Sequence, residues 1–107
     1  MAVYAAIYTY DESKHERRVE LLDEHRAWLA RLREDDRVHE AGPTAGEPGA
    51  LLVFEFESLS EATAALDEDP FFAAGLIEGR TLTEWHVRWG VVAASSAAYA
   101  SNAGVKL

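Results

Sequence analysis

The chain has 107 residues, the size of one ordinary domain, and 49% of them are hydrophobic, which is typical of a globular protein. Asp and Glu number 19 against 10 Lys and Arg, and this net charge of −9 argues against nucleic-acid and anionic-membrane partners. The absence of cysteine excludes disulfides, thiol catalysis and thiolate metal sites. Without a signal-peptide pattern or a long apolar stretch, we expect a cytoplasmic protein.

The first part of the chain predicts a strand, a helix and a second strand. Residues 3–10 form an apolar run rich in aromatic and β-branched side chains, which favours a strand covered on both faces. Ser13, with Glu16 three residues later, is typical of a capping box and predicts a helix over residues 14–33. After a polar turn, residues 37–41 predict a second strand.

The middle of the chain predicts a hairpin followed by a second helix. The second strand is expected to end at Gly42-Pro43, because both residue types are common in turns. A third strand follows over residues 50–56, where apolar side chains occupy one face throughout. Ser58 and Glu61 form another capping box, which predicts a helix through residue 68.

A new helical turn is predicted directly after this helix. Asp69 has the side chain of a good N-cap, and Pro70 suits the first helical position because its missing N–H needs no partner there. Gly75 is expected to end the turn. Residues 80–89 then predict the fourth strand, because apolar and polar side chains alternate along it.

These elements follow the order β-α-β-β-α-β, which predicts an α+β, ferredoxin-like fold with a four-stranded antiparallel sheet. Two helices on one face would leave the other sheet face apolar and bare, so we expect a homodimer packed through the sheet faces. We assign residues 1–90 to this domain. Residues 91–107 form an Ala/Ser-rich tail that is either flexible or packed against a partner.

Two ionisable side chains occupy the apolar side of the first predicted helix. At 100° per residue, Arg18 and His25 lie about 20° apart on the wheel, within the arc that carries the Leu side chains. A buried histidine is often bonded to a backbone carbonyl, and an arginine at the edge of an apolar stripe often extends to water. The alternative is a polar pocket beneath the helix, and two such residues on one stripe point to it.

Other candidate site residues have equally ordinary explanations. Asp69 is an N-cap from sequence alone, but a carboxylate that also reaches His25 would fix the imidazole tautomer and prepare the ring for general-base chemistry. Gly42 and Pro43 are a strand end or, alternatively, the wall of a pocket. No two histidines have the spacing of metal ligands, so we expect neither a metal nor another cofactor.

Taken together, these residues resemble the YciI-like (YCII-related) family over about residues 3 to 90. The resemblance is carried by an ordered set of short motifs: Arg18, His25-Arg26-Ala27-Trp28-Leu29, Ala41-Gly42-Pro43 and Asp69-Pro70-Phe71. It implies a dimeric α+β barrel of ferredoxin-like subunits. It also implies His25 and Asp69 as the catalytic pair, Arg18 as a pocket residue, and Gly42-Pro43 as pocket wall.

The resemblance also directs the functional hypothesis. The family includes a dehydrochlorinase acting on a chlorinated hydroxyquinol, and its fold is shared with muconolactone isomerases and cofactor-free monooxygenases. We therefore predict a small cofactor-independent enzyme whose His-Asp pair performs elimination, dehydrochlorination or isomerisation on a small substrate, such as an aromatic compound or a lactone. The alternative is a non-catalytic dimeric module that binds a small molecule or serves as an accessory subunit.

Overall fold

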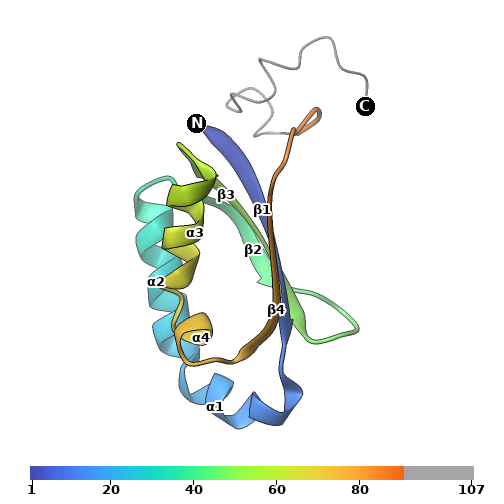
Figure 1. The fold of residues 1–107 in the computed structure, drawn as a ribbon. Coiled ribbons are helices and arrows are strands. Elements are labelled where there is room, and N and C mark those ends of the chain that lie inside the picture. The colour runs from blue at the N-terminus through green and yellow to red at the C-terminus, as the bar shows by residue number, and fades with distance from the viewer. Residues whose placement is uncertain (91–107) are drawn as a thin grey trace.

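The computed structural model describes residues 1–90, and in this part of the chain the elements follow the predicted β-α-β-β-α-β order. The strands form one antiparallel sheet in the order β2-β3-β1-β4, with the long helices stacked against one face (Figure 1). This confirms the predicted α+β fold. The elements are β1 (Ala2–Tyr10), the 3-10 helix η1 (Glu12–Lys14), α1 (His15–Glu20), α2 (Leu22–Glu34), β2 (Val38–Pro43), β3 (Gly49–Phe56), α3 (Leu59–Asp67), α4 (Pro70–Ala73) and β4 (Ile77–Glu84).

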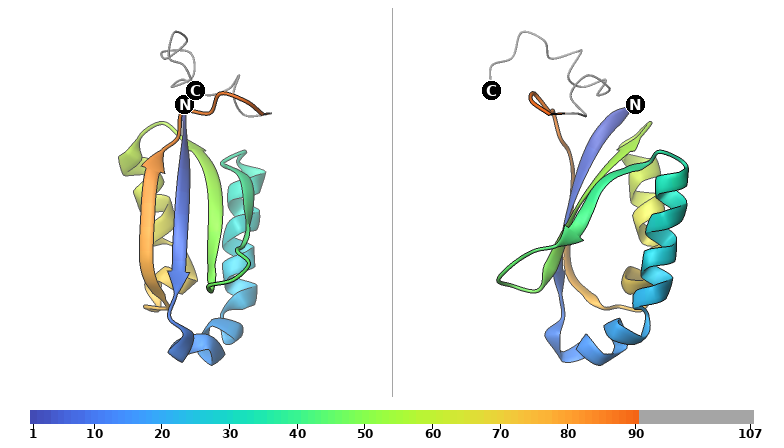
Figure 2. Two further views of the ribbon diagram at one scale, coloured as in Figure 1. Left: turned by 90° about the vertical axis from the view of Figure 1, so that its right-hand side faces the viewer. Right: turned by 180° about the vertical axis from the view of Figure 1, so that it is seen from behind.

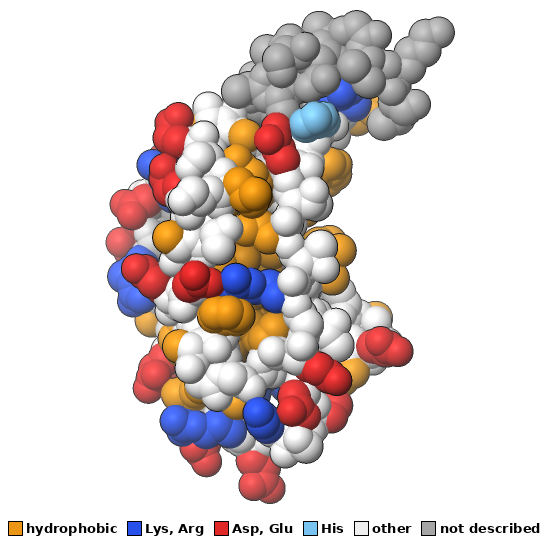
Figure 3. Space-filling model, viewed as in Figure 1, with side chains coloured by type: hydrophobic (Ala, Val, Ile, Leu, Met, Phe, Trp, Pro, Cys, Tyr) orange, Lys and Arg blue, Asp and Glu red, His pale blue; other side chains and the backbone are white. Residues whose placement is uncertain are grey.

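The core lies between the sheet and the helices. Alternate side chains of β1 and β3 point toward the helices, because successive residues of a strand face opposite ways. Trp28 of α2 and Leu66 of α3 fill the space above them, and the Trp28 indole N–H donates to the Ala65 carbonyl at 3.1 Å. Figure 3 shows apolar side chains along this seam and charged ones on the outer surface of the helices.

The prediction of one continuous helix over residues 14–33 is wrong, because the structure divides this segment among η1, α1 and α2. Asp11, not Ser13, caps its start: the Asp11 carboxylate accepts from the Ser13 N–H at 3.0 Å and from the Ser13 hydroxyl at 2.6 Å. The break between α1 and α2 falls at Leu21, whose N–H is shared between two carbonyls at 3.2 Å. Leu21 packs with Phe71 and Leu76, so the bend buries an apolar side chain that a straight helix would direct elsewhere.

The predicted ends of two strands also need correction. The second strand, predicted over residues 37–41, continues through Gly42 and ends at Pro43, because β3 begins early enough for Leu51 and Ala50 to pair with them. Gly49 permits this early start, since a Cβ there would overlap the carbonyl oxygen of Tyr8.

The fourth strand is β4, which begins before residue 80 and ends at Glu84 rather than at residue 89. Its neighbour β1 begins at Ala2, and the last contact between them is the Trp85 N–H donating to the Val3 carbonyl at 2.8 Å. β1 itself continues to Ala2, so β4 leaves the sheet before its neighbour ends.

The two later helix starts agree with the prediction. The Ser58 hydroxyl accepts from the Glu61 N–H at 3.1 Å and caps α3. Asp69 caps α4 with Pro70 in the first turn, and Gly75 follows with a φ of +72° that favours glycine. The chain therefore reverses sharply between α3 and β4, which brings Asp69 under α2.

The sheet face opposite the helices carries exposed apolar side chains, including Ile7 at 51% and Leu51 at 46% exposure. Figure 2 shows this face without a covering helix. At one end Val87 buries Val3 and Val53. The predicted tail over residues 91–107 lies outside the described residues. Within residues 1–90, the helices are too short or too polar to cross a bilayer.

Candidate active site

A buried histidine-carboxylate pair lies between α2 and the start of α4. The Nδ1 atom of His25 is 2.8 Å from Oδ1 of Asp69, although the two residues are 44 positions apart in the chain. His25 is 8% exposed and Asp69 is fully buried. The structure thus brings together the two residues that the sequence analysis singled out as a catalytic pair.

The N-cap geometry of α4 sets the tautomer of His25. Oδ1 of Asp69 accepts the Phe71 N–H at 3.0 Å and lies within hydrogen-bond distance of His25 Nδ1. Since a carboxylate only accepts hydrogen bonds, the neutral imidazole carries its proton on Nδ1 and leaves the lone pair on Nε2. The cap and the orientation of the imidazole therefore depend on the same oxygen atom.

Aromatic rings hold the imidazole in place. The ring of Phe71 stacks on His25 with a centroid distance of 4.1 Å and an angle of 2°, and Trp28 lies 5.7 Å away. Phe71 also meets Tyr10 edge to face at 5.9 Å. His25 is thus fixed by one hydrogen bond and by packing, as a positioned acid or base requires.

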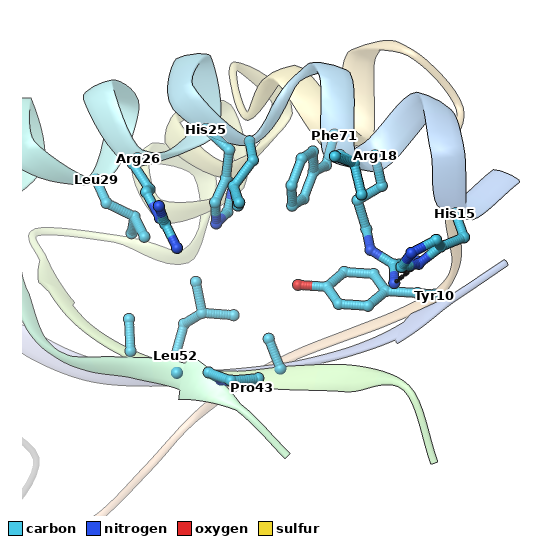
Figure 4. Close-up of a pocket in the computed structure, with 14 residues that line it drawn as sticks. Tyr10, His15, Arg18, His25, Arg26, Leu29, Pro43, Leu52 and Phe71 are labelled. Carbon is cyan, nitrogen blue, oxygen red and sulfur yellow. Dashed lines mark hydrogen bonds between the residues drawn. The ribbon is translucent and has the colours of Figure 1, made fainter. Parts of the chain in front are cut away.

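His25 opens onto a cavity of about 420 Å³ between α1, α2 and the sheet (Figure 4). Arg18, Gly42 and Pro43 line this cavity, while Asp69 lies behind His25 and does not. Arg18 and His25 therefore share one cavity even though the single helix that suggested their proximity is broken. The catalytic and binding roles of these five residues stay predictions.

Arg18 is held at one end of the cavity. Its guanidinium lies 4.4 Å from the centroid of the Tyr10 ring, 3.1 Å from Nδ1 of His15 and 3.5 Å from a carboxylate oxygen of Glu12. Its Nη1 atom is buried and has no hydrogen-bond partner in the described part of the chain. A buried guanidinium N–H of this kind is suited to an acceptor on a bound molecule.

Sequence analysis missed four residues of this site. Tyr10, His15 and Arg26 line the cavity, and the side chains of His15 and Arg26 are also exposed to solvent. Tyr8 has a buried hydroxyl close to the Asp69 carboxylate, whose Oδ2 is also buried. The clustering of tyrosines on one side of β1 was the available signal, but it is equally typical of an ordinary core.

The two tyrosines are kept in their protonated form. Burial raises the pKa of Tyr8, and the nearby Asp69 charge raises it further. Burial likewise raises the pKa of Tyr10, with Asp69 raising it and Arg18 opposing. Near neutral pH both hydroxyls are hydrogen-bond donors, and that of Tyr10 points into the cavity (Figure 4).

The fold and the site define a ferredoxin-like α+β domain in which a histidine-carboxylate pair faces a cavity of small-molecule size. Within the described residues, no group of three or more His, Asp or Glu side chains is arranged to hold a metal ion. The chain belongs to the YCII-related domain family, whose model matches residues 2–86.

Curated relatives agree with this assignment. Over 83 residues the chain is 36% identical to Protein YciI of Escherichia coli O6:H1 and to Protein YciI of Shigella flexneri. These alignments cover 67% of this chain and 85% of each relative.

Solved structures share the fold. The chain is similar to 5-chloro-2-hydroxyhydroquinone dehydrochlorinase (TftG) from Burkholderia phenoliruptrix AC1100, solved in complex with 2,5-dihydroxybenzoquinone. The TM-score is 0.71 at 24% identity, covering 78% of this chain and 92% of that one. An uncharacterized NIPSNAP domain protein from Burkholderia xenovorans matches with a TM-score of 0.52 at 14% identity, over 82% and 95% of the chains.

Proposed function

We propose that this protein is a small cytoplasmic enzyme that uses side chains alone for acid-base chemistry on a small molecule. The observation that carries the proposal is the 2.8 Å contact between buried Asp69 and His25 at the wall of a cavity. The N-cap role of Asp69 does not require contact with a histidine, and a purely structural histidine would not need to lie at the wall of a cavity. Their combination is the arrangement of a general base with its orienting carboxylate.

The proposed reaction begins with proton abstraction. Nε2 of His25 takes a proton from a carbon next to a carbonyl, and the C–H electron pair moves onto the carbonyl oxygen as an enolate. Arg18 binds that oxygen, and Asp69 stabilises the imidazolium that forms. The enolate then expels a leaving group such as chloride, which is elimination, or takes a proton at another carbon, which is isomerisation.

The substrate class follows from the cavity and from the structural neighbour. The cavity has apolar side chains on its floor and basic ones at its edges, which suits a flat, polar, aromatic-sized molecule. TftG is named as a dehydrochlorinase and was solved with a dihydroxybenzoquinone. Quinols, quinones and lactones are therefore the first compounds to test.

The homodimer belongs to the same proposal. We infer that two copies pack through the sheet faces that carry Ile7 and Leu51, because large exposed apolar side chains gather there. Sedimentation velocity should give twice the chain mass of 11.8 kDa. Ile7→Lys should shift the protein toward monomer, whereas Leu59→Lys, at an exposed apolar position of α3, should not. A monomeric wild-type protein contradicts the dimer.

The catalytic proposal is tested with defined compounds. The purified full chain is incubated with 5-chloro-2-hydroxyhydroquinone, and chloride release is measured. In parallel, lactones and enolisable ketones are incubated in D₂O, and exchange at carbon is followed by NMR. His25→Ala and Asp69→Asn should each lower the rate by about 10²–10⁴-fold while the protein stays folded.

The matched control is His86→Ala, because His86 is half exposed and hydrogen-bonded to Glu84 away from the cavity. Its rate should equal that of the wild type. Turnover that is unchanged in His25→Ala would contradict the proposal. Saturable binding of these compounds with no turnover of any of them would instead support the non-catalytic binding module.

A further inference from the structure

The cavity is basic in an otherwise acidic protein. Its titratable lining residues are two arginines, two histidines and one tyrosine, with no Asp or Glu among them. The whole chain carries 19 Asp and Glu against 10 Lys and Arg, so an all-basic lining departs from the composition. The lining favours a negatively charged occupant.

One end of the cavity is the Arg18 end. This guanidinium is oriented by the Tyr10 ring and by His15, and its buried Nη1 has no partner among residues 1–90. The exposed Glu12 carboxylate lies 3.5 Å from Nη2 and leaves Nη1 unpaired. A carboxylate or phenolate oxygen of a bound molecule would accept the hydrogen bond that the buried Nη1 of Arg18 can donate.

The other end is the Arg26 end. Arg26 follows His25 in α2, is exposed, and points toward the sheet at the cavity edge, on the side of His25 opposite Arg18 (Figure 4). The guanidinium of Arg26 has no hydrogen bond or ion pair with the side chains of residues 1–90. The hydroxyl of Tyr10 points into the space between the two arginines (Figure 4).

We propose that the cavity binds a small planar molecule with an anionic group at each end, one on Arg18 and one on Arg26. The middle of such a molecule lies beside His25 and the Tyr10 hydroxyl. A benzene ring with two carboxylates fits within about 420 Å³. The inference rests on the proposed function only in placing the reacting carbon beside His25, because the binding itself needs no chemistry.

The test uses binding of stable probes to the full chain. Isothermal titration calorimetry at pH 8 compares the three benzenedicarboxylates with benzoate and with neutral terephthalamide. We expect at least one dicarboxylate to bind about tenfold or more tightly than benzoate, since it makes a second charge-assisted contact. Terephthalamide should bind weakest, and added salt should weaken the dicarboxylate most.

The variants decide whether both arginines are used. In Arg18→Gln and in Arg26→Gln, the affinity ratio of dicarboxylate to benzoate should fall to about one. The matched control is Arg31→Gln, because Arg31 is exposed on the same helix and lies outside the cavity; its ratio should be unchanged. Circular dichroism verifies that each variant is folded.

The outcomes separate this inference from the proposed function. If no dicarboxylate binds more tightly than benzoate, or if Arg26→Gln behaves like Arg31→Gln, the two-ended ligand is overturned even where turnover depends on His25. If binding depends on both arginines while His25→Ala leaves every tested turnover unchanged, the ligand class stands and the acid-base proposal fails.

Discussion

Asp69 performs two tasks through one oxygen atom, and a pair of substitutions can separate its charge from its contacts. Asp69→Ala removes the charge and also both contacts of Oδ1, to the Phe71 N–H and to His25. Asp69→Asn removes the charge but keeps a carbonyl oxygen that can occupy the position of Oδ1. Because both variants relieve the same cost of burying a carboxylate, that cost cancels when they are compared.

The expected difference follows from the two contacts. Loss of an N-cap hydrogen bond costs about 1 kcal/mol. Leaving the buried Nδ1–H of His25 without a partner costs about 1–3 kcal/mol. Asp69→Ala should therefore be less stable than Asp69→Asn by about 2–4 kcal/mol, whatever the stability of each relative to the wild type.

Urea denaturation at pH 7 measures this difference. The three tryptophans provide the fluorescence signal, and protein concentration is held constant because association with a partner copy adds to stability. Asp69→Asn should also keep the His25 ring ordered in NMR spectra while turnover is lost. A difference below about 1 kcal/mol between the two variants would refute the argument, because it would mean that Oδ1 does not make both contacts in solution.

Two further predictions concern the core. Burial and the Asp69 charge raise the pKa of Tyr8 above its ordinary 10.0, so the folded state keeps this proton at a pH where the unfolded state loses it. The contribution of Tyr8 to the free energy of unfolding should therefore be complete below pH 10 and decrease as the pH rises above 10. In Tyr8→Phe, the free energy of unfolding from urea denaturation should decrease less steeply with pH above pH 10, by up to about 1.4 kcal/mol per pH unit. The same pH dependence in the variant and the wild type would contradict the prediction. Leu66→Ala should cost about 2–5 kcal/mol because Leu66 is fully buried, whereas Leu59→Ala, 52% exposed on the same helix, should cost under about 1 kcal/mol by thermal or urea unfolding.

The features that the sequence predicted correctly are those set by interactions between residues close together in the chain. The caps at Ser58 and Asp69 were predictable because the side chain bonds a backbone N–H two or three residues away. The sheet faces were predictable because side chains alternate along a strand. In each case, the signal and the structure it produces lie within one short segment.

Predictions failed where a distant segment decides the outcome. The helix breaks at Leu21 because Phe71 and Leu76 receive its side chain. The strand β4 ends at Glu84, and beyond it Val87 packs against Val3 and Val53 rather than continuing the predicted strand. The place of Arg26 at the cavity was not predicted, because a helix position alone does not show that the sheet encloses a cavity beside it.

The candidate site combines both kinds of information. The sequence by itself determined that Asp69 would cap a short helical turn and that His25 would lie on the buried side of its helix. Only the tertiary structure decided that the carboxylate meets the imidazole at 2.8 Å, because that contact joins residues 44 positions apart through the packing of α2 on α4. Local chemistry sets the position of each group, and long-range packing makes them a pair.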